Sequence, residues 1–418
     1  MRAHASTTLL GARALTGLVR GHDALDVNVA VADADVDSAG PASRRSSAGA
    51  ANFDIAAGGD RLPNRTLVHQ QAAPDHPRPT TAGLDLTHTP LAPLVRARLL
   101  NGSAQARWSD HTGPCVTQPT SRAVTTAADL TLLDAGLAGP SSRSLLALPG
   151  TVRAISAIAL RAMPGQAGRA VVATSTLRVA DLTLFAGSPA ELEVRVVSDP
   201  TLTVTSTGDA AHSTVTYRSP VLAVLRGGHS LGRIDARHPT LTIPLLAGLP
   251  NPLNLGAVRL ALGQLAVHRQ GAAVTGRAAL LDVRLLPAGK HGAAAEVVVG
   301  DQAASASAPA GGVDCAPDGP GNPGNPGNPG SPGNPGTPGS PGSPGNPGGS
   351  GNPPGGPAAP SQPGAQAAPV RDQTGRLAST NAAYNPIPYV AAGGAMLLFG
   401  CIMVAAIPRR RQADDVTG

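Results

Sequence analysis

The chain changes character abruptly at Ala316. From Gly321 to Gly348 every third residue is glycine and a proline precedes each one, as in Gly-Asn-Pro and Gly-Ser-Pro. Such a segment has almost nothing apolar to bury, so it cannot form a packed core. We therefore expect a folded region over 24–315 and a Pro/Gly-rich linker over 316–376. The linker is either a collagen-like rod or a semi-extended spacer of about 3.1 Å per residue. The small number of triplets favours the spacer.

The region before the linker is predicted to be an antiparallel all-β domain, sandwich- or barrel-like. In 24–36, Leu25, Val27, Val29 and Val31 alternate with small or polar residues, which is typical of a half-buried strand. Alternation or β-branched enrichment, with Gly, Ser, Asp and Pro clusters between the runs, predicts many more short strands. These are 94–108, 121–133, 172–184, 191–197, 202–206, 213–217, 221–225, 241–245, 258–268, 273–286 and 294–299.

Three other segments give weaker signals. The spacing of 145–160 fits either a strand pair or one short helix, and 37–85 is expected to be mostly loop with a short strand near 51–56. The N-terminal segment 1–20 is a poor leader, because Arg13 interrupts its apolar run. We interpret 1–20 as a poorly defined segment, a remnant of a leader or a start that differs from the true one.

Composition limits the core and the partners. Only 2% of residues are aromatic, so the core must consist of Leu, Val, Ala and Ile. The formal net charge is +6, but the arginines are scattered apart from one C-terminal trio. Nucleic-acid binding needs a clustered basic face with aromatic side chains for stacking, so no nucleic-acid partner is expected.

The C-terminal segment predicts a membrane anchor. The run 387–407 is uncharged and, as a helix, would span about 31 Å, close to the thickness of a bilayer core. Tyr384 and Tyr389 stand at its start, where aromatic rings suit the headgroup layer. Positive residues stay cytoplasmic, so the N-terminus is expected outside. The alternative is a buried core helix. The residues that set the orientation are Arg409, Arg410 and Arg411.

Two cysteines are predicted to form a disulfide. Cys115 and Cys315 each lie in a turn-like setting within the region expected outside the cell, where disulfides persist. Closing so long a loop would contribute about 5 kcal/mol in the chain-entropy model. The alternative is two unpaired thiols. Cys401 lies in the apolar run, and the absence of a Cys-x-x-Cys pair argues against structural zinc.

No catalytic, cofactor-binding or metal site is predicted. The sequence contains no phosphate-binding loop with lysine, no Gly-x-Ser-x-Gly nucleophile motif and no His-Glu-x-x-His motif. Three histidines lie near two aspartates, but none shows ligand spacing on a regular element, so we interpret them as solvated. These residues are His69, His76, His88, Asp75 and Asp85.

The residues before the apolar run resemble a sortase sorting signal of the LAxTG type found in actinobacterial surface proteins. The motif residues are Leu377, Ala378, Ser379, Thr380 and Asn381. The resemblance implies cleavage after Thr380 and linkage to peptidoglycan, with sortase as partner; the family has Gly where this chain has Asn381. A chain with one lysine and abundant Ala, Gly, Arg and Pro fits a high-GC bacterium.

The region before the linker also resembles such surface proteins, whose activity is not established. It shares a Val-rich opening strand, an Ala-Gln-Ala-Arg-Trp-Ser segment before Cys115 and a closing Cys315. We therefore expect a surface-anchored structural or adhesin-like interaction protein, held by wall or bilayer, with a ligand that the sequence does not specify. A surface-tethered enzyme acting on envelope polymers is the alternative.

Overall fold

The computed structural model describes residues 1–315, apart from short gaps. The gaps are 15–24, 58–59, 62–64, 90–91, 93–94, 117–118, 135–143, 180, 245–254 and 288–294. The predicted linker 316–376, the sorting motif and anchor 377–418 and the apolar run 387–407 lie outside the described residues. Within the described ranges, no helix has the length and apolar character needed to span a membrane.

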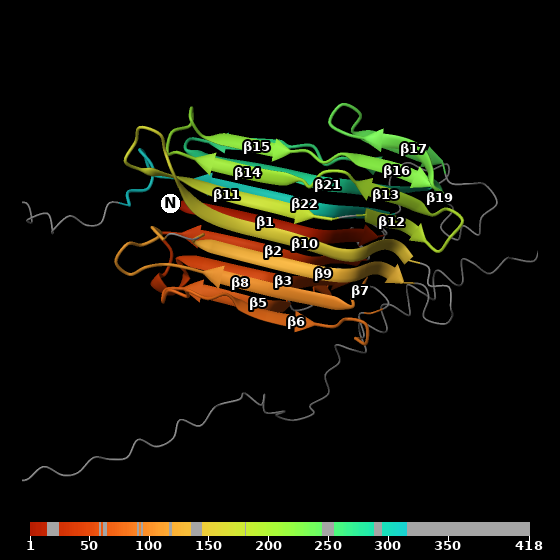
Figure 1. Ribbon diagram of the computed structural model, residues 1–418, viewed down its shortest axis with the longest axis horizontal. Coiled ribbons are helices and arrows are strands. Elements are labelled where there is room, and N and C mark those ends of the chain that lie inside the picture. Colours follow the sequence, from red (N-terminus) through yellow and green to blue (C-terminus); the bar gives the residue numbers. More distant parts are fainter. Residues whose placement is uncertain are drawn as a thin grey trace, which may run out of the picture. The chain divides into compact units, whose positions relative to one another are not determined.

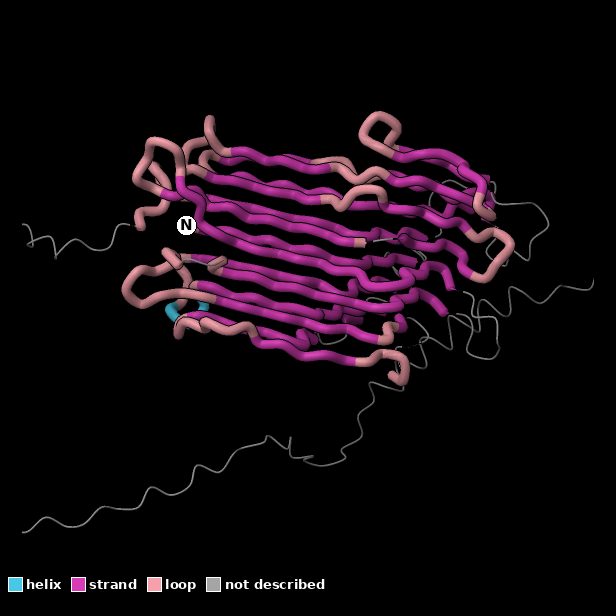
Figure 2. The backbone as a smooth tube through the Cα atoms, viewed as in Figure 1, coloured by secondary structure: helices cyan, strands magenta, loops and turns pink. Residues whose placement is uncertain are grey.

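The described region is all-β and antiparallel, as predicted, and its strands form two sheets that pack face to face (Figure 1). Strand dominates the described backbone, and connecting loops gather at the two ends of the strands (Figure 2). The only helical element there is the 3-10 turn η1 (Ala42–Arg44). The prediction of an antiparallel all-β region is therefore confirmed, although several strands are longer than expected, such as Ser144–Ala162 with 19 residues.

Sheet I contains the first and the last strands of the described chain. In spatial order it runs β18 (Thr240–Pro244), β19 (Leu255–Ala261), β21 (Ala273–Pro287), β22 (Ala295–Ser307), β1 (Arg2–Ala14), β2 (Leu25–Asp37), β3 (Ser46–Ala57) and β4 (Asp60–Arg61), with β20 (Ala266–Gln270) on β21 and β5 (Arg65–Ala72) on β3.

Sheet II holds the middle of the chain. Its main path is β15 (Thr214–Arg218), β14 (Thr201–Ser206), β11 (Arg169–Arg178), β10 (Ser144–Ala162), β12 (Asp181–Ala186), β13 (Leu192–Val196), β16 (Leu222–Arg226) and β17 (His229–Ile234). Beside this path, β9 (Ser121–Asp134) pairs with β10, β7 (Val95–Arg96) and β8 (Leu99–Ala106), and β6 (Thr80–Leu84) pairs with β8.

Several sequence expectations need correction. The segment 1–20 was expected to be poorly defined, but its residues 2–14 form β1, paired on both edges by β2 and β22. Arg13 does not break this strand, because its side chain is exposed. The supposed loop 37–85 contains β3, β5 and β6, whose Ala-, Ser- and Gly-rich sequences give weak strand signals. The ambiguous 145–160 is one long strand, β10, and β17 was missed.

The core consists almost entirely of Leu, Val, Ala and Ile, as predicted. Among the described residues, Trp108 is the only aromatic side chain that is fully buried, with 4% exposure. Apolar side chains form two clusters along the length of the strands. On β1, Ala3 and Ala5 belong to the smaller cluster and Leu9 to the larger one.

Buried polar side chains separate the two clusters and connect the sheets. Thr7 of β1, which is fully buried, lies 2.9 Å from the Ser156 hydroxyl and 2.6 Å from the Ser175 hydroxyl, both on sheet II. Ser156 donates to the carbonyl of Ala32 at 2.9 Å, and Gln302 donates to the carbonyl of Ser175 at 2.8 Å. Because buried polar groups cost stability unless paired, these bonds fix one alignment of the two sheets.

A transverse row of backbone irregularities, here called the bulge row, reverses the side-chain alternation of sheet I. Ala30, Ala51 and Gly300 have positive φ values of 61°, 56° and 67° on β2, β3 and β22, and β1 lies between β2 and β22. A Cβ at Gly300 would collide with Leu177 of sheet II. At this row two consecutive residues, such as Leu9 and Leu10, are both buried. The inward-facing positions therefore change from odd to even residue numbers, or the reverse, on crossing the row.

The bulge corrects one detail of the predicted β2 pattern. Val27 and Val29 are fully buried, as expected, but Val31 lies on the outer side and Ala32 points into the core. The left-handed backbone at Ala30, with φ 61°, shifts the alternation by one position, which a constant period of two does not anticipate.

The predicted disulfide is present. Cys115 and Cys315 are bonded, with their Cα atoms 5.5 Å apart. The bond joins the loop between β8 and β9 to the segment after β22. Next to it, the backbones of Arg169 and Val313 exchange hydrogen bonds of 2.9 and 2.8 Å, so the end of the described chain is attached at two points.

Candidate functional site

The outer face of sheet I is a broad polar surface, here defined as the solvent-facing side chains of β1, β2, β19, β21 and β22. The bulge at Ala30 creates its acidic character. Asp26 has an even number and lies before the bulge, whereas Asp33 and Asp35 have odd numbers and lie after it. All three nevertheless stand next to buried residues and face outward. With unbroken alternation, one of these sets would point into the core.

Three side chains on this face converge into a compact cluster, the His4–Asp33–Asp35 cluster. His4 pairs in register with Asp35 on β2, and the next outward residue of β1 pairs with Asp33. His4 Nδ1 lies 2.8 Å from Asp35 Oδ1 and 3.5 Å from Asp33 Oδ1. One ligand-type atom from each side chain falls within 4.8 Å of the other two.

The electrostatics of this cluster are strongly perturbed. Burial raises the pKa of Asp33 to about 6, and the charge of Asp35 adds to this while His4 opposes it. The hydrogen bond to Asp35 raises the pKa of His4, against the effect of burial. Asp33 Oδ1 is shielded from solvent and has no hydrogen-bond partner in the described structure. The cluster therefore places a carboxylate oxygen without a hydrogen-bond partner next to an imidazole, an arrangement that favours cation binding.

Two shallow hollows beside the cluster share a boundary. One has a volume of about 400 Å³ and the other about 310 Å³. Thr8, Arg277 and Asp301 line both, and His4 lines the larger. Arg277 Nη2 lies 3.4 Å from Asp301 Oδ2, so an ion pair stands where the hollows meet. Small side chains around it leave the surface open to an extended ligand.

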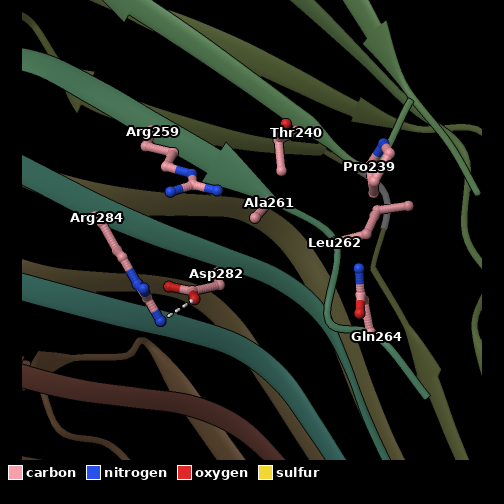
Figure 3. Close-up of a pocket in the computed structure, with 8 residues that line it drawn as sticks. All are labelled: Pro239, Thr240, Arg259, Ala261, Leu262, Gln264, Asp282 and Arg284. Carbon is pink, nitrogen blue, oxygen red and sulfur yellow. Dashed lines mark ion pairs between the residues drawn. The ribbon is translucent and has the colours of Figure 1, made fainter. Parts of the chain in front are cut away.

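A third hollow, of about 200 Å³, lies on the same face near β18 and β19 (Figure 3). Arg284 Nη2 lies 2.9 Å from Asp282 Oδ2 and 3.1 Å from Glu296 Oε1. Burial, together with the charge of Glu296, raises the pKa of Asp282. Arg259 also lines the hollow and forms no ion pair with any described residue. This site could accept an anionic group.

The structure brings together only some of the residues that the sequence analysis identified as candidates. Cys115 and Cys315 come together, whereas the sorting motif and Arg409, Arg410 and Arg411 lie outside the described residues. His69 lies on β5, and among the described residues His69, His76 and His88 form no cluster of potential metal ligands. Asp75 instead binds Arg107 at 2.8 Å, and Asp85 accepts a hydrogen bond from the Thr87 backbone at 2.8 Å.

The His4–Asp33–Asp35 cluster was missed because it depends on strand pairing. Asp33 and Asp35 lie two residues apart on one strand, which is a visible signal for a shared face. His4, however, lies in the segment set aside as poorly defined, and only the β1–β2 register brings it beside them.

Comparison with protein-family models, with curated proteins and with solved structures gives no match.

Proposed function

We propose that this chain is a surface-anchored interaction protein of a bacterial envelope, whose β-sandwich binds a polar polymer or a neighbouring surface through the outer face of sheet I. The observation that carries the proposal is the continuity of that face. Charged and small side chains extend over β1, β2, β21 and β22, and the hollows among them are shallow. An extended polymer can lie along such a surface, whereas a small substrate normally needs an enclosing pocket.

The location rests on the sequence. The apolar run 387–407 with its arginines supports a bilayer anchor, and the linker 316–376 supports display at a distance from the membrane. The motif ending at Thr380 supports transfer to peptidoglycan by sortase, while Asn381 supports retention in the bilayer. The disulfide at Cys315 adds a structural argument, because it secures the sandwich where the linker begins.

Cell fractionation tests the location. Muramidase should release the protein from cells together with peptidoglycan fragments if sortase attaches it. Release by detergent alone would leave the bilayer anchor and remove the sortase step. A tag placed after Val416 should be inaccessible from outside intact cells, and an accessible tag would overturn the proposed orientation.

A binding assay tests the interaction surface. Cells that display the full chain are incubated with insoluble envelope polysaccharide, and bound cells are counted. Replacing Arg277 by Glu (Arg277→Glu) places two like charges at the junction of the hollows and should reduce retention at least fivefold. The matched control is Arg153→Glu, an exposed residue on β10 of sheet II, which should bind normally. Equal retention of both variants would contradict the proposed surface.

One observation favours an enzyme as the second candidate. A carboxyl group with a raised pKa beside a second carboxyl group is typical of general acid–base catalysis, and Asp33, with a pKa of about 6, lies near Asp35. The pair nevertheless sits on an open strand face. Release of soluble fragments from envelope polymers, abolished by Asp33→Asn, would favour the enzyme; intact polymers after incubation would favour the binding protein.

A further inference from the structure

We propose that His4, Asp33 and Asp35 form a binding site for a divalent transition-metal cation, with Zn²⁺ as the probe. The inference is independent of the proposed function, since it concerns three side chains and their geometry. Each contributes one ligand atom, an imidazole nitrogen or a carboxylate oxygen, from two paired strands of sheet I. The backbone between these strands is held by the ladder, so the ligands are carried on a rigid element.

The distances suit a metal after small side-chain rotations. Two ligands of a tetrahedral Zn²⁺ ion lie about 3.4 Å apart when each bond is about 2.1 Å long. In the cluster, His4 Nδ1 is 2.8 Å from Asp35 Oδ1 and 3.5 Å from Asp33 Oδ1, which brackets that value. All three ligand atoms lie within 4.8 Å of one another, so the backbone need not move.

An orphaned oxygen gives a second, independent reason. Asp33 Oδ1 is buried and has no hydrogen-bond partner among the described residues, although it points toward His4. A buried acceptor without a donor costs stability unless something satisfies it. A cation between Asp33, Asp35 and His4 would satisfy this oxygen and also offset the repulsion between the two carboxylates.

The donor set selects the class of cation. Ca²⁺ and Mg²⁺ prefer oxygen ligands alone, whereas an imidazole nitrogen with two carboxylate oxygens suits Zn²⁺ and its first-row neighbours. The three side chains remain partly exposed, at 41% for His4, 34% for Asp33 and 48% for Asp35. Three protein ligands leave a coordination position open, so water or a polar group of an external ligand can complete the site.

The chain contains a matched control. His212 and Asp209 form an exposed histidine–aspartate pair in the turn between β14 and β15, without a second carboxylate in a three-residue cluster. A specific three-ligand site should depend on His4 and not on His212. Adventitious binding to surface histidines would depend on both.

The test is Zn²⁺ titration of the full, chelator-treated protein by calorimetry, with the melting temperature as a second measurement. One equivalent of Zn²⁺ should bind and raise the melting temperature, because the ion binds only the folded cluster. His4→Gln and Asp33→Asn should each weaken Zn²⁺ binding at least tenfold, and His212→Gln should not. Ca²⁺ and Mg²⁺ at the same concentration should produce no saturable heat.

The variants change outward-facing side chains, so their metal-free melting temperatures should stay within a few degrees of the parent and establish that they fold. The proposal is overturned if no stoichiometric Zn²⁺ binding is found. It is also overturned if His4→Gln binds as tightly as the parent, or if His212→Gln weakens binding as much as His4→Gln does.

Discussion

Removal of the disulfide should produce a large loss of stability in this protein. Cys115 and Cys315 are separated by 200 residues, so the bond closes a loop that contains most of the described chain. In the chain-entropy model, a loop of this length contributes about 5 kcal/mol by restricting the unfolded state. Replacing both residues by serine should lower the free energy of unfolding by an amount approaching that value.

Denaturant titration measures this loss directly. Trp108 is the only tryptophan, is 4% exposed and belongs to the same core cluster that Cys115 contacts, so its fluorescence reports unfolding of that region. The double variant should unfold at a lower denaturant concentration, and a reducing agent should shift the parent equally. Cys401→Ser, which removes the cysteine outside the disulfide, is the matched control and should leave the midpoint unchanged.

The reasoning would be refuted by a loss below about 1 kcal/mol, since loop closure over such a length cannot be that weak unless the unfolded chain is already compact. A midpoint shift in Cys401→Ser equal to that of the double variant would also refute it. In that case the effect would come from a general response to serine and not from the crosslink.

Two further predictions concern the bulge row and a loop ion pair. Ala30→Val should lower the free energy of unfolding by about 2–3 kcal/mol, because a β-branched residue is poorly tolerated at φ 61° and the site is fully buried. Ala32→Val, at an equally buried position of the same strand, is the control and should lower it less. Equal losses in the two variants would contradict the strain argument. Hydrogen bonds from Arg107 hold the pKa of Asp75 below its usual value. The ion pair therefore stabilises the folded state by about 1 kcal/mol above pH 4, and this stabilisation is lost as the pH falls through the folded-state pKa of Asp75. Asp75→Asn should remove this component from the acid unfolding curve, and an unchanged curve would contradict it.

The sequence predicted the second half of the sandwich better than the first. From β11 onward, β-branched and leucine residues alternate with polar ones between clear turn signals, so most strands were located correctly. In the first half, β1 and β3 are built largely from Ala, Ser, Thr and Gly, whose strand signals are weak. They are strands because tertiary packing of small residues against sheet II stabilises them, and packing is not visible in a local pattern.

The candidate site was less predictable than the fold. The cysteine pairing followed from two cysteines expected outside the cell, whereas the His4–Asp33–Asp35 cluster requires both the β1–β2 register and the parity reversal at Ala30. The polar residues of β2 have even numbers at Asp26 and odd numbers from Asp33 onward, and this change is visible in the sequence. Such a change indicates a backbone irregularity within a strand, but it does not identify the partner strand.

Because β1 pairs with β22 along its entire length, the order of synthesis matters for this protein. The ribosome makes β1 first, and its second neighbour emerges only after about 300 further residues, when Ala295–Ser307 is complete. Until then the nascent chain carries an unpaired strand edge, which is a template for mispairing with other chains. Correct folding of this protein is therefore favoured by a factor that shields the β1–β2 pair until β22 is complete.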